Sequence, residues 1–216
     1  MTKQIIYEKM NSDNTALLVI DIVNGCCHKK CEKPEWGITF SKIRQMVPKL
    51  DKFIGEYRKK FGGLICFAKI TPWQEKFLTD NIKELYKDPK AYYYSDDSTG
   101  FSEEFYLLKP QKSDFVFTKN HYDCFTDQGF IKELQTRKIR YFVIAGVFTD
   151  GCVLSTIISG FSQGFNFIIL RDLIETTDVK TRQGLQKILK EYTFPVMYGK
   201  TITSKQFLQA CQNEKI

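Results

Sequence analysis

Short apolar runs alternate along this chain with stretches of helical periodicity, and this alternation constrains the fold more than any other feature. Runs of strand length occupy 15–20, 64–68, 115–118, 140–146, 165–170 and, more weakly, 195–198. Helical patterns occupy 41–60, 73–87, 127–138, 151–163, 178–191 and 204–212. Fully apolar strands joined through helices form parallel sheets covered on both faces. We therefore predict a Rossmann-type α/β fold: a three-layer sandwich with a six-stranded, mainly parallel sheet.

Three single residues give local expectations within this pattern. Pro48 lies inside the helical stretch 41–60, so that helix either starts near Pro48 or kinks there. Asp127 and Ser204 stand where helix N-caps are expected.

Length and composition favour one domain over residues 1–216. No apolar run approaches the ~18 residues that span a bilayer, and the N-terminus lacks the apolar core of a signal peptide. Seven cysteines, an odd number, argue against a disulfide framework. We expect a cytoplasmic protein with reduced thiols and no membrane partner.

The charge balance predicts no particular partner. Lysine and arginine number 32 against 25 acidic residues, which gives a formal net charge of +7. The basic residues are scattered and their short clusters are not interleaved with aromatic residues, so we expect no nucleic-acid partner. No Gly-x-Gly-x-x-Gly motif follows an expected strand, and no cofactor is predicted.

Three reactive side chains follow the carboxyl ends of expected strands. Asp21 follows 15–20, Lys119 follows 115–118, and Cys152 lies at the start of the helix after 140–146. In a parallel sheet these ends share one edge, where ligands bind. A helix N-terminus and an ammonium both favour a thiolate, and a carboxylate can move the thiol proton. Each residue alone has an ordinary structural explanation, but together they predict a nucleophilic cysteine site.

These stretches resemble the isochorismatase-like cysteine hydrolases. Residues 15–24 are similar to the opening strand of that superfamily, and 114–119 with Cys124 and Phe125 to its lysine strand. Residues 143–153 contain Gly-Val-x-Thr-x-x-Cys-Val, which is similar to its nucleophile loop, and 167–172 resemble the next strand. The blocks agree in order and spacing from Thr15 to about Lys190.

The resemblance implies an Asp21–Lys119–Cys152 catalytic triad and a cis peptide at Val147–Phe148. It also implies an oxyanion hole formed by the amides of Phe148 and Cys152. Members of the superfamily hydrolyse C–N bonds of small amides or ureido compounds through a thioester, and they often assemble as homo-oligomers. Isochorismatases themselves cleave a vinyl ether without needing the thiol, so Cys152 favours amide-type hydrolysis.

The chain departs from the superfamily's patterns at several positions. The superfamily's nicotinamidases carry an Asp-x-His metal motif after the second strand, but residues 68–74 contain no histidine here. We therefore predict no metal site. Val23 stands where a glutamine is common. Phe148 stands where a small residue is usual, and its ring either narrows the pocket or points elsewhere.

Other residues near the expected site have two interpretations each. Phe125, Trp73 and His121 are candidates for substrate contact, or they belong to the core or surface. The motif Cys26-Cys27-His28-x-x-Cys31 is a loop without special chemistry, a metal site, or a redox partner of Cys152.

The leading hypothesis is a cysteine hydrolase of small-molecule C–N bonds in which Cys152 is the nucleophile, Asp21 the acid and base, and Lys119 the electrostatic partner. The alternatives are an isochorismatase-type vinyl-ether hydrolase and a non-catalytic binding module on the same fold.

Overall fold

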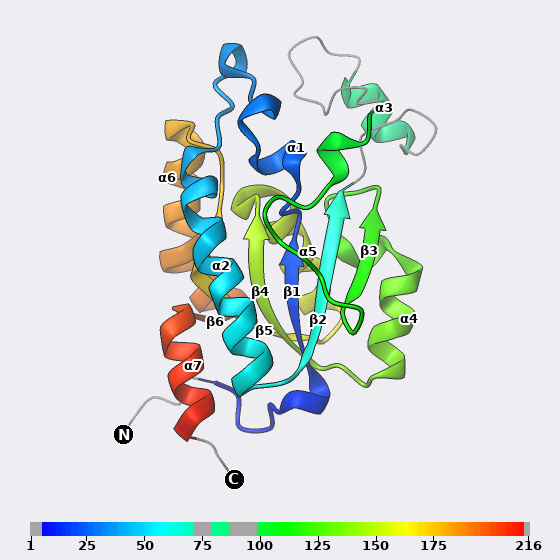
Figure 1. The fold of residues 1–216 in the computed structure, drawn as a ribbon, viewed down its shortest axis with the longest axis vertical. Coiled ribbons are helices and arrows are strands. Elements are labelled where there is room, and N and C mark those ends of the chain that lie inside the picture. Colours follow the sequence, from blue (N-terminus) through cyan, green and yellow to red (C-terminus); the bar gives the residue numbers. More distant parts are fainter. Residues whose placement is uncertain (1–5, 71–78, 87–98, 214–216) are drawn as a thin grey trace.

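Six strands form one sheet in the order β3-β2-β1-β4-β5-β6, and every pairing between neighbours is parallel (Figure 1). The structure is a computed structural model that describes residues 6–70, 79–86 and 99–213. The strands are β1 (Thr15–Ile20), β2 (Leu64–Ile70), β3 (Phe115–Lys119), β4 (Tyr141–Val147), β5 (Asn166–Glu175) and β6 (Gly199–Ile202). The predicted six-stranded α/β fold is confirmed.

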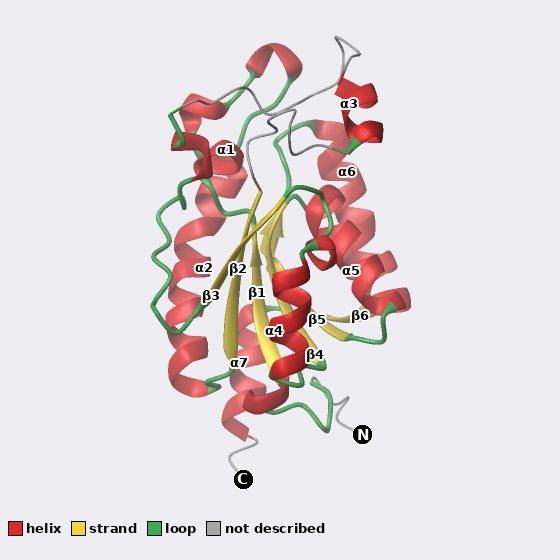
Figure 2. Cartoon of the chain, turned by 90° about the vertical axis from the view of Figure 1, so that its right-hand side faces the viewer, coloured by secondary structure: helices red, strands yellow, loops and turns green. Residues whose placement is uncertain are grey.

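Helices cover both faces of this sheet (Figure 2). On one side lie α2 (Ser41–Lys60) and α7 (Ser204–Asn213), and on the other α4 (Gln128–Thr136) and α5 (Leu154–Ser162). Beyond the carboxyl ends of the strands lie α1 (Asn24–Cys27) and α3 (Asp80–Tyr86) (Figure 1). The last crossover contains α6 (Lys180–Ile188), which continues as the π-helical segment Leu189–Tyr198.

The central strands are apolar because both of their faces are buried. Every residue of β1 is buried, as is every residue of β4 after Tyr141. Helix α2 runs over its predicted length, and Pro48 lies inside it without ending it. One face of α2 is buried against the sheet and α7, and this burial outweighs the hydrogen bond that a proline removes. The buried side chains are Ile43, Met46, Val47, Leu50, Phe53, Ile54 and Tyr57.

Helix α2 is capped by a residue distant in the chain, and helix α7 by a local capping box. The Asp178 carboxylate accepts hydrogen bonds from the Ser41 and Lys42 amides, at 2.7 and 3.1 Å, and so caps α2. Helix α7 begins with a capping box, since the Thr203 hydroxyl accepts from the Gln206 amide and the Gln206 side chain accepts from the Thr203 amide. Ser204, predicted as this cap, instead donates its hydroxyl hydrogen to Asp172.

The predicted sixth strand is wrong in position. Residues 195–198 belong to the π-helical segment, and β6 follows at Gly199–Ile202. This edge strand is half-buried throughout and carries polar residues, so it has no continuous apolar run. The predicted N-cap Asp127 is confirmed, because its carboxylate accepts from the Phe130 amide at 2.7 Å. Of the predicted helix 73–87, residues 73–78 and 87 lie outside the described part.

Gly146 lets β1 and β4 approach closely beside the functional edge. Its φ is +123°, and a Cβ added there would lie 2.2 Å from the Ile20 carbonyl oxygen. Only glycine fits both restrictions. Within the described ranges, no helix is both long and apolar enough to cross a membrane.

Candidate active site

The three predicted strand-end residues meet in one buried cluster. Lys119 Nζ lies 2.8 Å from Asp21 Oδ2 and 3.3 Å from Cys152 Sγ. Its third contact is the His121 carbonyl oxygen at 3.0 Å. A lysine ammonium has three hydrogens, so each has an acceptor. Lys119 is therefore fixed between the carboxylate and the sulfur.

The sheet directs Asp21 and Lys119 toward each other. Lys119 is the last residue of β3 and lies beside Ile70 at the end of β2. Asp21 follows β1 with φ +54°, a left-handed conformation that aspartate tolerates better than most residues. Its amide donates to the Ala68 carbonyl oxygen of β2 at 3.1 Å, which ties Asp21 to the end of the β1–β2 pairing.

Asp21 has the environment of a proton acceptor. Its Oδ1 is buried and has no hydrogen-bond partner among the described residues. Burial raises the pKa of the Asp21 carboxyl above its usual value, and the nearby Lys119 ammonium opposes that shift. Burial alone would lower the pKa of Lys119, but the Asp21 and Cys152 charges outweigh it and the net pKa is raised. Lys119 is therefore a permanent ammonium.

Cys152 is buried beside Lys119, and this burial opposes the thiolate that the neighbouring charges favour. Burial raises the pKa of its thiol well above the usual value, and Lys119 counteracts only part of this shift. The sequence indicates the charges that favour a thiolate but not this desolvation, since it does not show that only 4% of Cys152 is exposed. The raised pKa favours the neutral thiol.

The nucleophile loop has the backbone that the resemblance implied. The Val147–Phe148 peptide bond is cis, and Thr149–Val153 form a π-helical turn before α5. The Phe148 ring packs on the Phe40 ring, with 6.0 Å between centroids, and below the Arg182 guanidinium at 4.9 Å. These contacts hold the large ring in the packing between the loop and its neighbours.

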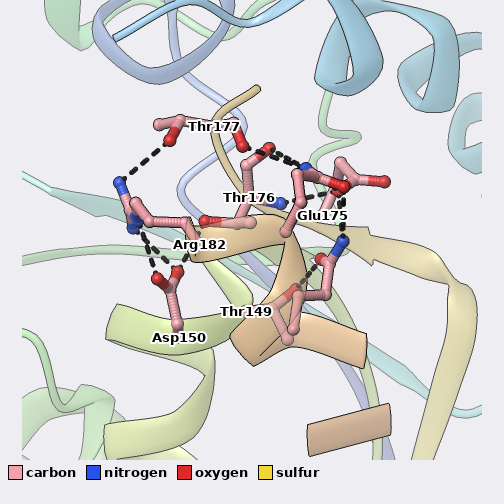
Figure 3. Close-up of polar contacts among 8 residues, drawn as sticks. Thr149, Asp150, Glu175, Thr176, Thr177 and Arg182 are labelled. Atoms are coloured by element: carbon pink, nitrogen blue, oxygen red, sulfur yellow. Dashed lines mark hydrogen bonds and ion pairs between the residues drawn. The ribbon is translucent and has the colours of Figure 1, made fainter. Parts of the chain in front are cut away.

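A polar network beside this loop was missed by the sequence analysis. Figure 3 shows Asp150 paired with Arg182, and Thr149 joined to the same group of residues that contains Glu175 and Thr176. No motif marks these residues. The one available signal is Gln186, a polar residue on the inner face of an amphipathic helix, where it is only 5% exposed.

The predicted substrate-contact residues have three different outcomes. Phe125 is in the core, where its ring packs against Phe130, Phe142 and Phe165, so the structure does not support its predicted substrate contact. Trp73 lies outside the described residues. His121 supplies the carbonyl oxygen that holds Lys119, and its Nδ1 is buried with no hydrogen-bond partner in the described ranges. Contact between the His121 ring and substrate stays a prediction.

The cysteine-rich loop has a structural explanation. Cys26 and Cys27 are buried in α1, and His28 Nδ1 accepts from the Lys30 amide at 3.1 Å. The His28 ring packs edge-on against Phe101 and Tyr106. Among the residues that the structure describes, no three histidine, cysteine or acidic side chains are grouped so that they could hold a metal ion.

Known proteins share this fold and sequence pattern. The Isochorismatase domain profile matches residues 15–201. YwoC, an uncharacterised isochorismatase family protein of Bacillus subtilis (strain 168), is 24% identical over 195 residues, which cover 90% of this chain and 93% of YwoC. The ureidoacrylate amidohydrolase RutB of Pseudomonas savastanoi pv. phaseolicola is 38% identical over 65 residues, 30% of this chain and 26% of RutB.

Solved structures agree on the fold. A cysteine hydrolase from Pseudomonas syringae pv. phaseolicola 1448A has a TM-score of 0.79 and 19% identity, with 99% of each chain covered. The nicotinamidase PncA from Bacillus subtilis has a TM-score of 0.64 and 17% identity, covering 88% of this chain and 99% of PncA.

The three-layer fold, with a cysteine at the carboxyl edge of its parallel sheet, defines the class as an α/β protein with a candidate active site at the strand ends. The chain belongs to the isochorismatase family, and it is a hydrolase of that family.

Proposed function

We propose that this protein is a cysteine hydrolase that cleaves a C–N bond of a small amide or ureido compound through a thioester at Cys152. One observation carries the proposal: a single buried ammonium, Lys119 Nζ, touches both the Asp21 carboxylate and the Cys152 sulfur. A nucleophile, a proton acceptor and a fixed positive charge in contact are the groups that acyl transfer needs.

The proposed reaction begins with proton transfer. The Cys152 thiol gives its proton to Asp21 Oδ1, which has no hydrogen-bond partner within the described ranges, as the sulfur attacks the carbonyl carbon. The amides of Phe148 and Cys152 stabilise the oxyanion that forms. The C–N bond then breaks, and the leaving nitrogen takes the proton from Asp21. Finally, water attacks the thioester carbonyl as Asp21 takes a proton from it, the C–S bond breaks, and Asp21 returns the proton to the sulfur, which restores the thiol and the carboxylate.

The named relatives support the reaction class. RutB is called a ureidoacrylate amidohydrolase, and PncA a nicotinamidase, so each name describes cleavage of a C–N bond. Transfer of that class to this chain is part of the proposal, because the RutB match covers only 30% of the chain and the PncA likeness shows the fold.

A screen of small amides and ureido acids, with mass spectrometry of the intact protein, tests the proposal. We expect turnover of at least one compound and an acyl adduct on Cys152. Cys152→Ala should abolish both, while Cys124→Ala is the matched control. Cys124 is also buried, burial raises the pKa of its thiol to about 12, and it lies outside the nucleophile loop.

The other outcomes of this screen identify the alternatives. Full amide hydrolysis by Cys152→Ala would contradict the thioester mechanism. Turnover of isochorismate by Cys152→Ala would instead identify a vinyl-ether hydrolase. No turnover and no adduct would favour a binding module.

A further inference from the structure

Helix α6 contacts three consecutive side chains of the nucleophile loop. These are Phe148, Thr149 and Asp150, which directly precede Gly151 and Cys152. The loop thus has two supports: α5 follows it in the chain, and α6 holds it from the side (Figure 3).

The strongest of the three contacts is the pair of Asp150 and Arg182. Arg182 Nε and Nη2 each donate to a different oxygen of the Asp150 carboxylate, both at 2.7 Å. Such a two-point contact fixes direction as well as distance. The Thr176 hydroxyl, at the end of β5, also donates to Asp150. The carboxylate two residues before the nucleophile is therefore held by groups from two other elements.

The second contact is buried. The Thr149 hydroxyl donates to Gln186 Oε1 at 2.7 Å, and Gln186 Nε2 donates to Glu175. Arg182 and Gln186 are four residues apart, so they project from the same face of α6. One helix face thus holds two neighbouring loop residues.

The third contact involves Phe148, whose amide belongs to the proposed oxyanion hole. The same Arg182 guanidinium that binds Asp150 lies 4.9 Å from the centre of the Phe148 ring. Arg182 therefore links the residue at the start of the loop to the residue near Cys152.

We propose that Arg182 and Gln186 are positioning residues for the reaction, which set the loop so that both oxyanion donors and the Cys152 sulfur face one carbonyl. This inference rests on the proposed function. A small displacement of reacting groups by a distant change can lower the rate roughly 100-fold, so the contacts described above are expected to affect the chemical step.

The Arg58–Asp114 pair offers a matched control. Arg58 Nη1 and Nη2 each donate to a different oxygen of Asp114. As in the Arg182–Asp150 pair, the arginine is partly exposed and the carboxylate is buried. Asp114 directly precedes β3, so this pair lies at the opposite end of the sheet from Cys152. The Arg58–Asp114 pair stabilises the fold from this distant end and does not contact the nucleophile loop.

The experiment measures single-turnover acylation of Cys152 by p-nitrophenyl acetate in the full-length protein. Arg182→Ala should lower the limiting acylation rate roughly 10- to 100-fold, with the half-saturating concentration changed by less than about twofold. Gln186→Leu should lower it less. Arg182→Lys keeps the charge but not the two-point contact, so it serves if Arg182→Ala fails to fold. Arg58→Ala should keep the wild-type rate.

Hydrogen exchange of residues 148–153 supplies a second readout that needs no substrate. Exchange should become faster in the Arg182 variants and stay unchanged in Arg58→Ala. Equal acylation rates in Arg182→Lys and Arg58→Ala, or faster exchange without a slower rate, would overturn the positioning role alone. Failure of the wild-type protein to acylate at Cys152 would overturn the proposed function, and the positioning role with it.

Discussion

Buried charged side chains are hydrogen-bonded differently at the two ends of the sheet. At the carboxyl end, Lys119 and Asp21 are fully buried, and Asp21 Oδ1 has no partner among the described residues. At the amino end, Asp114 accepts hydrogen bonds from Arg58 and from the Gln111 amide, and Arg58 reaches the surface. One end leaves a proton acceptor unsatisfied, whereas the other satisfies its carboxylate. Under the proposed function, this contrast separates groups that take part in the chemistry from groups that stabilise the fold.

Replacing Asp21 and Asp114 in turn with asparagine tests the contrast between the two ends most directly. Asp21→Asn should lower the rate of Cys152 acylation by p-nitrophenyl acetate about 10²- to 10⁴-fold, because the thiol proton loses its acceptor. Asparagine also tolerates the left-handed backbone at this position. Asp114→Asn should leave the rate unchanged. Equal effects of the two substitutions would contradict the division between the two ends.

Removing each cation should change stability unequally. At neutral pH, Lys119→Met should lower the free energy of unfolding by about 3–5 kcal/mol, because it leaves the buried Asp21 uncompensated. Arg58→Met should lower it by about 1–2 kcal/mol. The Asp21 pKa, already raised by burial, rises further without Lys119. The folded state then binds a proton more readily than the unfolded state, so Lys119→Met should recover stability as the pH falls. Urea titrations across this range provide the test.

The two ends of the sheet can also be compared through two glycines that have a positive φ. Gly146→Ala, at the carboxyl end, should cost about 2–4 kcal/mol, since its Cβ would meet the Ile20 backbone as well as an unfavourable φ. Gly164 lies just before β5 with φ +89°, and nothing lies within 4 Å of its added Cβ. Gly164→Ala should cost only about 1 kcal/mol. Thermal unfolding of both variants separates the cost of the Cβ contact with Ile20 from the cost of the positive φ. Equal losses of stability in the two variants would contradict the role of the Ile20 contact.

The smallest expected effect is the acid sensitivity contributed by Asp150. Burial favours a raised pKa for this carboxyl, but hydrogen bonds from Arg182 and Thr176 outweigh it and the pKa is lowered. Its stabilisation is therefore complete above the unfolded value of about 3.9 and is lost as the pH falls through the lower folded value. Asp150→Asn should remove about 1 kcal/mol or less at neutral pH and flatten the acid side of the stability profile. An unchanged acid slope in urea titrations would contradict this assignment.

Local patterns predicted the elements whose burial is complete. The bounds of β1 are predicted to the residue and those of α2 over its whole length, since every position of β1 is buried and α2 has one apolar face. The sixth strand was misplaced because the edge strand Gly199–Ile202 is half-buried and lacks that signal. Asp178 was missed as a cap because it lies 137 residues from the Ser41 amide that it binds.

The site shows the same limit. Asp21, Lys119 and Cys152 could be found because each follows a recognisable strand, and parallel strands bring their ends together. The order of strands in the sheet, the burial of Cys152 and the contacts of Arg182 depend on packing between segments far apart in the chain. The burial that opposes ionisation of the Cys152 thiol and the contacts of α6 are therefore not predicted from the sequence.

All three N–H groups of the Lys119 ammonium are hydrogen-bonded, so the total charge of Lys119, Asp21 and Cys152 stays constant during the proposed proton transfer. Before the proposed reaction, the ammonium balances the carboxylate beside a neutral thiol; after proton transfer, it balances a thiolate beside a neutral carboxyl. The proton shifts between two neighbours of one immobile cation, so no uncompensated charge forms inside the protein. The interior then needs little rearrangement to follow the reaction, since the same ammonium already contacts both acceptors.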